Sequence, residues 1–311
     1  MSLDHVLSVS QFFNPSLLEQ LFSRAAYLER ADKGNYLEPT LKNKMLATLF
    51  YEPSTRTRFS FESAMQKLGG NVITTESAGM FSSAIKGETL EDTIKITSGY
   101  ADAIVLRHPE LGSAARAAVV SEVPVINAGD GPGEHPTQAL LDIYTIKKEL
   151  GRIEGLKVAM VGDLRYGRTV HSLLQLLALF PNVSMYFVSP QAVELPEKYS
   201  IYLTENGVQF NYLQEFDSIL GEIDVMYVTR IQKERFASQD DYDVVKDAFV
   251  ITSKTLEKMK QNSIVMHPLP RVGEILPEVD MDPRAAYFRQ AKNGLYVRMA
   301  LLELLMQNRQ T

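Results

Sequence analysis

The sequence predicts an α/β protein built from two domains of similar size, each a parallel β-sheet flanked by helices. Short runs of β-branched residues alternate along the chain with amphipathic segments, and strands that alternate with helices favour parallel sheets. Four strand-like runs precede Gly151 and five follow it, so the pattern restarts near the middle of the chain. A length of 311 residues also suits two domains, because domains usually contain roughly 100–200 residues.

The strands expected in the first half are Met45–Phe50, Val72–Thr75, Ala103–Leu106 and Val123–Ile126. A helix is expected over Thr55–Leu68, because the glycine pair that begins at Gly69 stops it. Thr89–Asp92 matches a capping box that opens the next helix, and an alanine-rich helix follows the third strand. Pro136 suits the first turn of a helix that runs to about Gly151.

The strands expected in the second half are Lys157–Val161, Ser184–Val188, Val208–Tyr212, Asp224–Val228 and Ser263–Met266. A long helix is expected near the C-terminus, over about Leu295–Gln307. The first domain is therefore placed at residues 1–150 and is completed by the C-terminal helix at about 290–311. The second domain is placed at 151–289.

The composition is ordinary for a soluble globular protein, with 45% apolar and 23% charged residues. No apolar run approaches the ~18 residues that a membrane span requires, and Met1–Ser10 lack the basic start and apolar stretch of a secretion signal. The chain has no cysteine, which excludes disulfides, thiolate metal sites and cysteine nucleophiles. This composition fits a reducing compartment, so we expect a cytoplasmic location.

The formal net charge is −6, which argues against nucleic acid and against an anionic membrane surface as partners. An acidic protein that binds anions must concentrate positive charge locally. Ligands of open α/β sheets bind beyond the carboxyl ends of the strands. Basic residues at the ends of the predicted strands are therefore the feature that bears most directly on function.

The segment Tyr51–Phe59 follows the first predicted strand and opens a predicted helix. A helix N-terminus presents unpaired backbone N–H groups and the positive end of the helix dipole. Arg56 adds a planar cationic fork, and hydroxyl donors come from Ser54, Thr55 and Thr57. These residues predict a phosphate site built without a glycine loop. The alternative is an ordinary helix cap with surface arginines, and Arg58 is expected to be structural.

Further basic and polar residues lie near other strand and helix ends of the first half. Lys86 lies beside Gly87 in a loop, where the residues alone favour a solvated lysine. Arg107 comes at the end of the third strand, and His135 and Gln138 lie at the start of a helix. Only the company of the arginines makes His135 a candidate for binding rather than a polar surface group.

The second half repeats the arrangement at Gly162–Thr169, which follows a predicted strand and opens a helix. The middle glycine of a dinucleotide fingerprint and the Gly-Lys-Ser/Thr of a P-loop are both missing there. A small anionic ligand is therefore expected in place of NAD or ATP. Arg230 lies at another strand end, and two prolines within His267–Arg271 permit a cis bond.

Four arginines thus lie at strand or helix ends in an acidic protein: Arg56, Arg107, Arg168 and Arg230. Each two-pronged contact of an arginine with an anion contributes roughly 1.5–3 kcal/mol. The set predicts a site for a phosphate plus one or two carboxylates. No cluster of residues with metal-ligand spacing is evident, so no metal is expected.

These motifs together resemble those of the aspartate and ornithine carbamoyltransferase family. The segments that carry the resemblance are Ser54–Arg58, Lys86–Thr89, Arg107–Pro109, His135–Gln138, Gly162–Leu164, Gly167–Thr169, Thr229–Arg230 with Gln232, and His267–Arg271. They occur in the order of the family and span about residues 5–305. No single motif is specific, but the combination is.

The same motifs look like those of the aspartate branch. That branch is similar at Arg168, at Arg230 with Gln232, and at His267–Pro270, where the ornithine branch carries a cysteine that this chain lacks. Two positions depart from the family pattern. Ile85 stands where a second basic residue is common, and Gly273 stands where an acidic residue is common. These departures bear on loop behaviour more than on substrate contacts.

The resemblance implies that carbamoyl is transferred from carbamoyl phosphate to L-aspartate in pyrimidine biosynthesis, without a cofactor. It implies an active site in the interdomain cleft, with carbamoyl phosphate on the first domain and aspartate on the second. It further implies a homotrimer whose active sites are shared between subunits, because Ser82 and Lys86 come from a neighbour in this family. Regulatory chains are an additional partner that the family allows.

Carried over by position, the phosphate-binding residues are Ser54, Thr55, Arg56 and Thr57. Arg107 would bridge the phosphate and the carbonyl oxygen, and His135 would also donate to that oxygen. The carbamoyl NH₂ would be held by Gln138 and by the backbone at Leu269 and Pro270. The aspartate carboxylates would be bound by Arg168, Thr169, Arg230 and Gln232. The catalytic residues would be Arg56, Thr57, Lys86, Arg107 and His135.

Three other functions remain open at this stage. The acceptor could be a different amine such as ornithine, although Arg168 and Arg230 do not suit a cationic ligand. A homologue that binds ligand without turnover would normally have lost an arginine or the histidine. A nucleotide-binding module lacks its glycines. One further hypothesis is that Glu52 pairs with Arg168 or Arg235 when the cleft closes.

Overall fold

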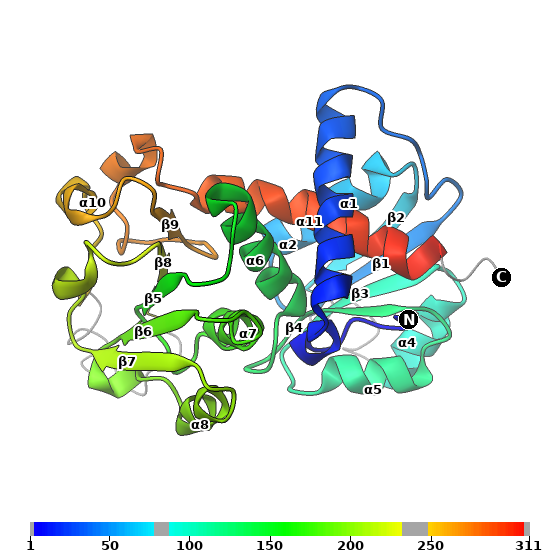
Figure 1. The fold of residues 1–311 in the computed structure, drawn as a ribbon. Coiled ribbons are helices and arrows are strands. Elements are labelled where there is room, and N and C mark those ends of the chain that lie inside the picture. Colours follow the sequence, from blue (N-terminus) through cyan, green and yellow to red (C-terminus); the bar gives the residue numbers. More distant parts are fainter. Residues whose placement is uncertain (1–2, 78–86, 232–247, 308–311) are drawn as a thin grey trace. The chain divides into compact units, whose positions relative to one another are not determined.

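The structure is a computed structural model that describes residues 3–77, 87–231 and 248–307. Its contacts divide the chain into two compact units. The first comprises residues 1–141 and 292–311, and the second comprises 142–291. Each unit contains one wholly parallel sheet with helices packed around it (Figure 1). The predicted fold class, two parallel-sheet domains with flanking helices, is therefore confirmed.

The four strands of the first unit lie in the order β2-β1-β3-β4. They are β1 (Met45–Phe50), β2 (Asn71–Glu76), β3 (Ala103–His108) and β4 (Val125–Asp130). The helices are α1 (Pro15–Lys33), α2 (Thr55–Lys67), α4 (Leu90–Ser98) and α5 (Ser113–Val120). Residues of β1 and β3 are almost all buried, whereas the edge strand β2 is largely exposed. The central strands therefore read as continuous apolar runs.

The five strands of the second unit lie in the order β7-β6-β5-β8-β9. They are β5 (Lys157–Val161), β6 (Ser184–Val188), β7 (Gln209–Leu213), β8 (Val225–Val228) and β9 (Ile264–Met266). The helices are α7 (Arg168–Leu177), α8 (Glu197–Glu205) and α10 (Ser253–Lys258). Two longer helices, α6 (Pro136–Leu150) and α11 (Tyr287–Gln307), each include residues of both units.

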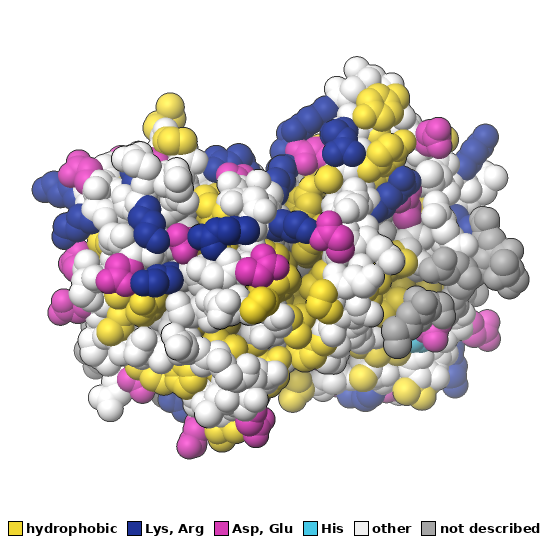
Figure 2. All heavy atoms as spheres, viewed as in Figure 1, with side chains coloured by type: hydrophobic (Ala, Val, Ile, Leu, Met, Phe, Trp, Pro, Cys, Tyr) yellow, Lys and Arg dark blue, Asp and Glu magenta, His cyan; other side chains and the backbone are white. Residues whose placement is uncertain are grey.

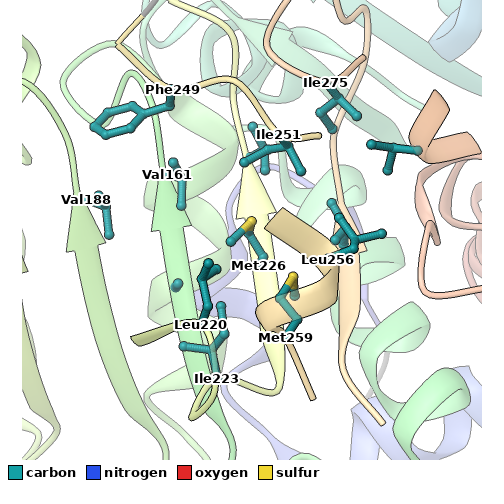
Figure 3. Close-up of a cluster of buried hydrophobic side chains, with 14 of the residues drawn as sticks. Val161, Val188, Leu220, Ile223, Met226, Phe249, Ile251, Leu256, Met259 and Ile275 are labelled. Carbon is teal, nitrogen blue, oxygen red and sulfur yellow. The ribbon is translucent and has the colours of Figure 1, made fainter. Parts of the chain in front are cut away.

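The core of the second unit is an apolar cluster beneath its central strands. Figure 3 shows Met226 of β8 lying among side chains that include Leu256 and Met259, which α10 and its end contribute. The first unit has its own cluster around Ala47, Ile104 and other residues of β1, β3 and α4. Burial of such clusters is the main force that holds a helix against a sheet.

The predicted and observed elements differ in three places. The strand expected at Val123–Ile126 instead runs from Val125 to Asp130, because its pairing with β3 extends to His108, which lies opposite Asp130. Helix α11 begins eight residues before the predicted Leu295, with Gly294 in its interior. Helix α1 was not predicted, although Asn14 caps it and a proline occupies its first position.

None of the helices described is both long and apolar enough to cross a membrane. On the face shown in Figure 2, Lys and Arg side chains are interspersed with Asp and Glu. Positive charge therefore does not gather into one broad patch on that face.

Gly162, directly after β5, has a φ of +115°, and a Cβ there would lie 2.1 Å from the backbone oxygen of Thr229. Gly207 also has a positive φ, +68°, but nothing lies within 4 Å of its virtual Cβ. We expect Gly162→Ala to lower the unfolding free energy by more than about 3 kcal/mol, because a clash adds to backbone strain. Gly207→Ala should cost about 1 kcal/mol. Urea denaturation measures both, and equal losses would contradict the close approach at Gly162.

Candidate active site

In each unit several candidate residues follow the two strands at which the strand order reverses. The reversal lies between β1 and β3 in the first unit and between β5 and β8 in the second. Ser54 and Arg107 come at the ends of β1 and β3, and Arg168 and Arg230 follow β5 and β8. Open α/β sheets bind ligands outside the strand ends at this switch point. The topology therefore places these four residues, two in each unit, at the edge of the sheet where such folds bind ligands.

Helix α2 begins at Thr55, and Ser54 occupies its N-cap position. The Ser54 hydroxyl makes no capping hydrogen bond, so the side chain that would normally accept from the first-turn N–H groups does not do so. Thr57 is buried in the same turn. The arrangement leaves the start of α2 suited to an external anion.

Arg56 is the cation of this helix start. Its side chain reaches solvent, yet nearby protein atoms desolvate it enough to lower the pKa of the guanidinium below its usual value. Among the described residues, no acidic group contributes to that shift. Arg58, by contrast, forms an ion pair with Glu76 at 3.0 Å, as expected for a structural arginine. Partial desolvation of a cation favours its pairing with an anion, which makes Arg56 a candidate for anion binding.

Arg107 lies near the end of β3, and its guanidinium contacts two oxygens. Nη1 donates to the carbonyl oxygen of Ala128 at 3.1 Å, and Nη2 lies 3.5 Å from Oε2 of Glu52. Glu52 is therefore paired within the first unit. The pairing of Glu52 with Arg168 on cleft closure stays a prediction, and Arg235 lies outside the described residues.

The turn after β4 is held by one carboxylate. Asp130 accepts the backbone N–H groups of Gly112 and Glu134, at 3.0 and 2.9 Å, and the side-chain amide of Asn127 at 3.2 Å. His135 and Gln138 follow this turn at the start of α6 and are buried. Nδ1 of His135 lies 3.5 Å from Oγ1 of Thr137. His135 is thus largely shielded from water.

The turn after β5 is built in the same way. Asp163 accepts the backbone N–H groups of Arg165 and Tyr166 at 3.1 and 2.9 Å, and Thr229 donates to the backbone oxygen of Asp163 at 3.2 Å. Helix α7 then begins at Arg168, after a glycine that offers no capping side chain. Arg168 and Thr169, in its first turn, are both half-buried.

The segment after β9 is fixed by a buried pair. Nδ1 of His267 accepts the backbone N–H of Leu269 at 2.7 Å, so Nε2 carries the proton and donates to Oε1 of Glu274 at 2.7 Å. Burial alone would raise the pKa of Glu274, but the hydrogen bonds from His267 and from the backbone at Gly273 lower it to about 2. The Leu269–Pro270 bond is cis, which confirms that prediction.

Three predicted site residues, Ser82, Lys86 and Gln232, lie outside the described residues. The sequence analysis missed the carboxylates that brace the three turns, Asp130, Asp163 and Glu274. The sequence did contain a signal for Asp130 and Asp163, because each lies next to a glycine at or just after the end of a strand, where a side chain can accept backbone N–H groups of the turn. Within residues 3–77, 87–231 and 248–307, no group of three or more His, Asp or Glu side chains could hold a metal ion.

Comparisons with known proteins match nearly the whole length of the chain. The family described as "Aspartate/ornithine carbamoyltransferase, carbamoyl-P binding domain" matches residues 4–148, and its "Asp/Orn binding domain" matches residues 154–305. A relative from Pisum sativum, named aspartate carbamoyltransferase 2, chloroplastic, is 52% identical over 305 residues, which is 98% of this chain and 79% of the relative.

Two solved structures are similar over nearly all of both chains. The catalytic subunit of aspartate transcarbamoylase from M. jannaschii has a TM-score of 0.92 and 48% identity, covering 99% of each chain. The aspartate transcarbamoylase of Trypanosoma cruzi in complex with N-(phosphonacetyl)-L-aspartic acid has a TM-score of 0.93 and 39% identity, covering 98% of this chain and 96% of the other.

His171 of α7 gives the second unit a measurable pH dependence. Its Nε2 donates to the backbone oxygen of Leu164 at 2.8 Å, and its ring stacks on Tyr199 with centroids 4.2 Å apart. Burial lowers the pKa of His171 from 6.5 to about 4. Between these values the unfolded chain binds a proton that the folded chain does not, so stability falls as the pH drops through this window.

We expect this contribution to reach about 3 kcal/mol and to vanish in His171→Gln, whose amide can still donate to Leu164. Urea denaturation at pH 7 and pH 4.5 measures it in both proteins. Glu274 has a folded-state pKa of about 2, so its stabilising contribution is lost mainly below pH 4.5. It therefore adds little to the difference in stability between pH 7 and pH 4.5. An equal fall in stability for wild type and variant would contradict the assignment to His171.

Proposed function

Because this chain belongs to the aspartate/ornithine carbamoyltransferase family, we propose that it transfers the carbamoyl group of carbamoyl phosphate to the amino group of L-aspartate. The products are N-carbamoyl-L-aspartate and phosphate, and the reaction serves pyrimidine biosynthesis. The observation that carries the proposal is the presence of arginines at the switch point of each sheet, Arg107 in the first unit and Arg168 with Arg230 in the second.

Residues 1–150, with the helix at 290–311, are proposed to form the carbamoyl-phosphate domain, and 151–289 the aspartate domain. The phosphate is held by the N-terminal turn of α2, through Ser54, Thr55, Arg56 and Thr57. The uncapped helix start and the desolvated Arg56 support this role. Gln138 and the backbone at Leu269 and Pro270 hold the carbamoyl NH₂.

In the proposed mechanism the amine of aspartate attacks the carbamoyl carbon, and the new C–N bond produces a tetrahedral oxyanion. Arg107, Thr57 and His135 donate hydrogen bonds to that oxygen, where negative charge develops. The C–O bond to phosphate then breaks, and Arg56 with Lys86 stabilises the departing phosphate. The phosphate takes the amine proton, so the scheme requires neither a protein base nor a cofactor. Most of the rate gain comes from positioning two anions against their repulsion.

The choice of aspartate over ornithine rests on charge. Two arginines, Arg168 and Arg230, with Thr169 and Gln232, suit the two carboxylates of aspartate and would repel the side-chain ammonium of ornithine. The Trypanosoma cruzi relative is described in complex with aspartate and phosphate, and with carbamoyl aspartate and phosphate. Those ligands are consistent with the proposed substrates and products.

We further propose a homotrimer in which each active site is completed by Ser82 and Lys86 of a neighbouring subunit. This proposal rests on the family resemblance of the Lys86–Thr89 segment. Regulatory chains remain an additional proposed partner, since relatives are named as catalytic subunits. A cytoplasmic location is proposed from the cysteine-free composition. The proposed location differs from that of the plant relatives, which are named chloroplastic.

The test is product formation from carbamoyl phosphate with L-aspartate in one reaction and L-ornithine in another. Turnover is expected with aspartate alone. Arg107→Ala should lower kcat by about 10²–10³, the usual cost of an oxyanion donor. Arg116→Ala, which removes a surface arginine paired with Glu91 and Glu110 in the same unit, serves as the matched control and should keep near-normal kcat.

Turnover with ornithine would overturn the proposed role of the second unit while leaving the phosphate site intact. A near-normal kcat for Arg107→Ala would remove Arg107 from the mechanism. Absence of turnover with either amine would favour a protein that binds without catalysis or that requires a partner.

A further inference from the structure

A chain of buried polar side chains crosses the interior of the second unit. Asp142 of α6 and Tyr227 of β8 are fully buried, and Gln290 of α11 is 1% exposed. The Tyr227 hydroxyl donates to Oδ2 of Asp142 at 2.8 Å, and the Gln290 side-chain amide donates to Oδ1 at 2.7 Å. Each carboxylate oxygen thus receives at least one hydrogen bond, in an interior where an unsatisfied charge would be costly.

Both ends of this chain reach segments that the proposed function uses. At one end the Tyr227 hydroxyl interacts with the side chain of Thr169, in the first turn of α7. At the other end Oε1 of Gln290 accepts the backbone N–H of His267 at 2.9 Å. His267 opens the segment that contains Leu269 and Pro270.

The direction of every bond is fixed by chemistry. The Asp142 carboxylate can only accept, so the Gln290 NH₂ group must face it and the Gln290 oxygen must face the N–H of His267. A flipped amide would oppose two acceptors at one end and two donors at the other. Because Tyr227 donates to Asp142, its oxygen accepts from Thr169, and this orients the Thr169 hydroxyl.

We infer that Asp142, Tyr227 and Gln290 are positioning residues that orient Thr169 for aspartate and the His267–Pro270 segment for the carbamoyl NH₂. The inference rests on the proposed function. None of the three residues needs to touch substrate, and none was a site candidate from the sequence. A purely structural role would make the network matter for stability alone, whereas a positioning role makes it matter for the KM of aspartate.

Tyr227→Phe removes the hydroxyl and keeps the ring, so it breaks the chain at its centre. Tyr296→Phe is the matched control, because Tyr296 is also buried and donates to an aspartate, Asp32, at 3.1 Å in the first unit. Tyr227→Phe is expected to raise the KM of aspartate by about 5- to 30-fold, the effect of one hydrogen bond to a charged group. The KM of carbamoyl phosphate should change less than about 2-fold.

A double-mutant cycle with Thr169→Val shows whether Tyr227 acts through Thr169. The effect of Tyr227→Phe on the KM of aspartate should then largely disappear in the Thr169→Val background, because coupled residues are not additive. Additive effects would overturn the inference. The inference would also be overturned if Tyr227→Phe had the same kinetics as Tyr296→Phe and only its melting temperature were lower. Should Tyr227→Phe not fold, Gln290→Met breaks the same chain at its other end. It is expected to raise the KM of carbamoyl phosphate, because the His267–Pro270 segment holds the carbamoyl NH₂.

The proposed function and this inference fail in different ways. If the wild-type protein does not turn over aspartate, the proposed function fails, and the inference that rests on it fails with it. If the wild type is active and Tyr227→Phe resembles the control, the inference alone is overturned.

Discussion

In each unit the carboxyl ends of the parallel strands and the N-termini of the helices that follow them meet at one edge of the sheet. This geometry determines where the candidate binding residues lie. In the first unit it brings Ser54 and Arg107, more than fifty residues apart in the sequence, to the ends of the paired strands β1 and β3. In the second it brings Arg168 and Arg230 to the ends of β5 and β8. An acidic protein can therefore bind anions at these edges, because helix N–H groups and arginines add locally.

Positive charge at a strand end is useful only if the loop that carries it is rigid. The three turns solve this with buried or half-buried carboxylates that accept backbone N–H groups: Asp130 after β4, Asp163 after β5 and Glu274 after β9. Such turns lose little entropy when a ligand binds. Preorganised donors are also what stabilises an oxyanion at low cost. The loop carboxylates are thus as much a part of the site as the arginines.

Much of this arrangement could be predicted from the sequence, because alternation of apolar strands with amphipathic helices is a local signal. All nine strands in the described residues were expected, and β1, β5 and β6 had the predicted bounds. The extension of β4 to Asp130 could not be foreseen, since it depends on pairing with His108 of β3, more than twenty residues away. The pairing of Glu52 with Arg107 and the Asp142–Gln290 bond likewise join distant parts of the chain. Local patterns do not encode such contacts.

We propose that the start of α2, with Arg56, binds the phosphate of carbamoyl phosphate. Calorimetric titration of carbamoyl phosphate into the intact protein tests this binding, with Arg56→Ala and Arg168→Ala as a pair. Arg56→Ala is expected to weaken binding by about 10- to 100-fold, the effect of one charged hydrogen-bonding group. Arg168→Ala is expected to bind carbamoyl phosphate like the wild type. Unchanged affinity in Arg56→Ala, or equal losses in both variants, would show that Arg56 does not hold the phosphate.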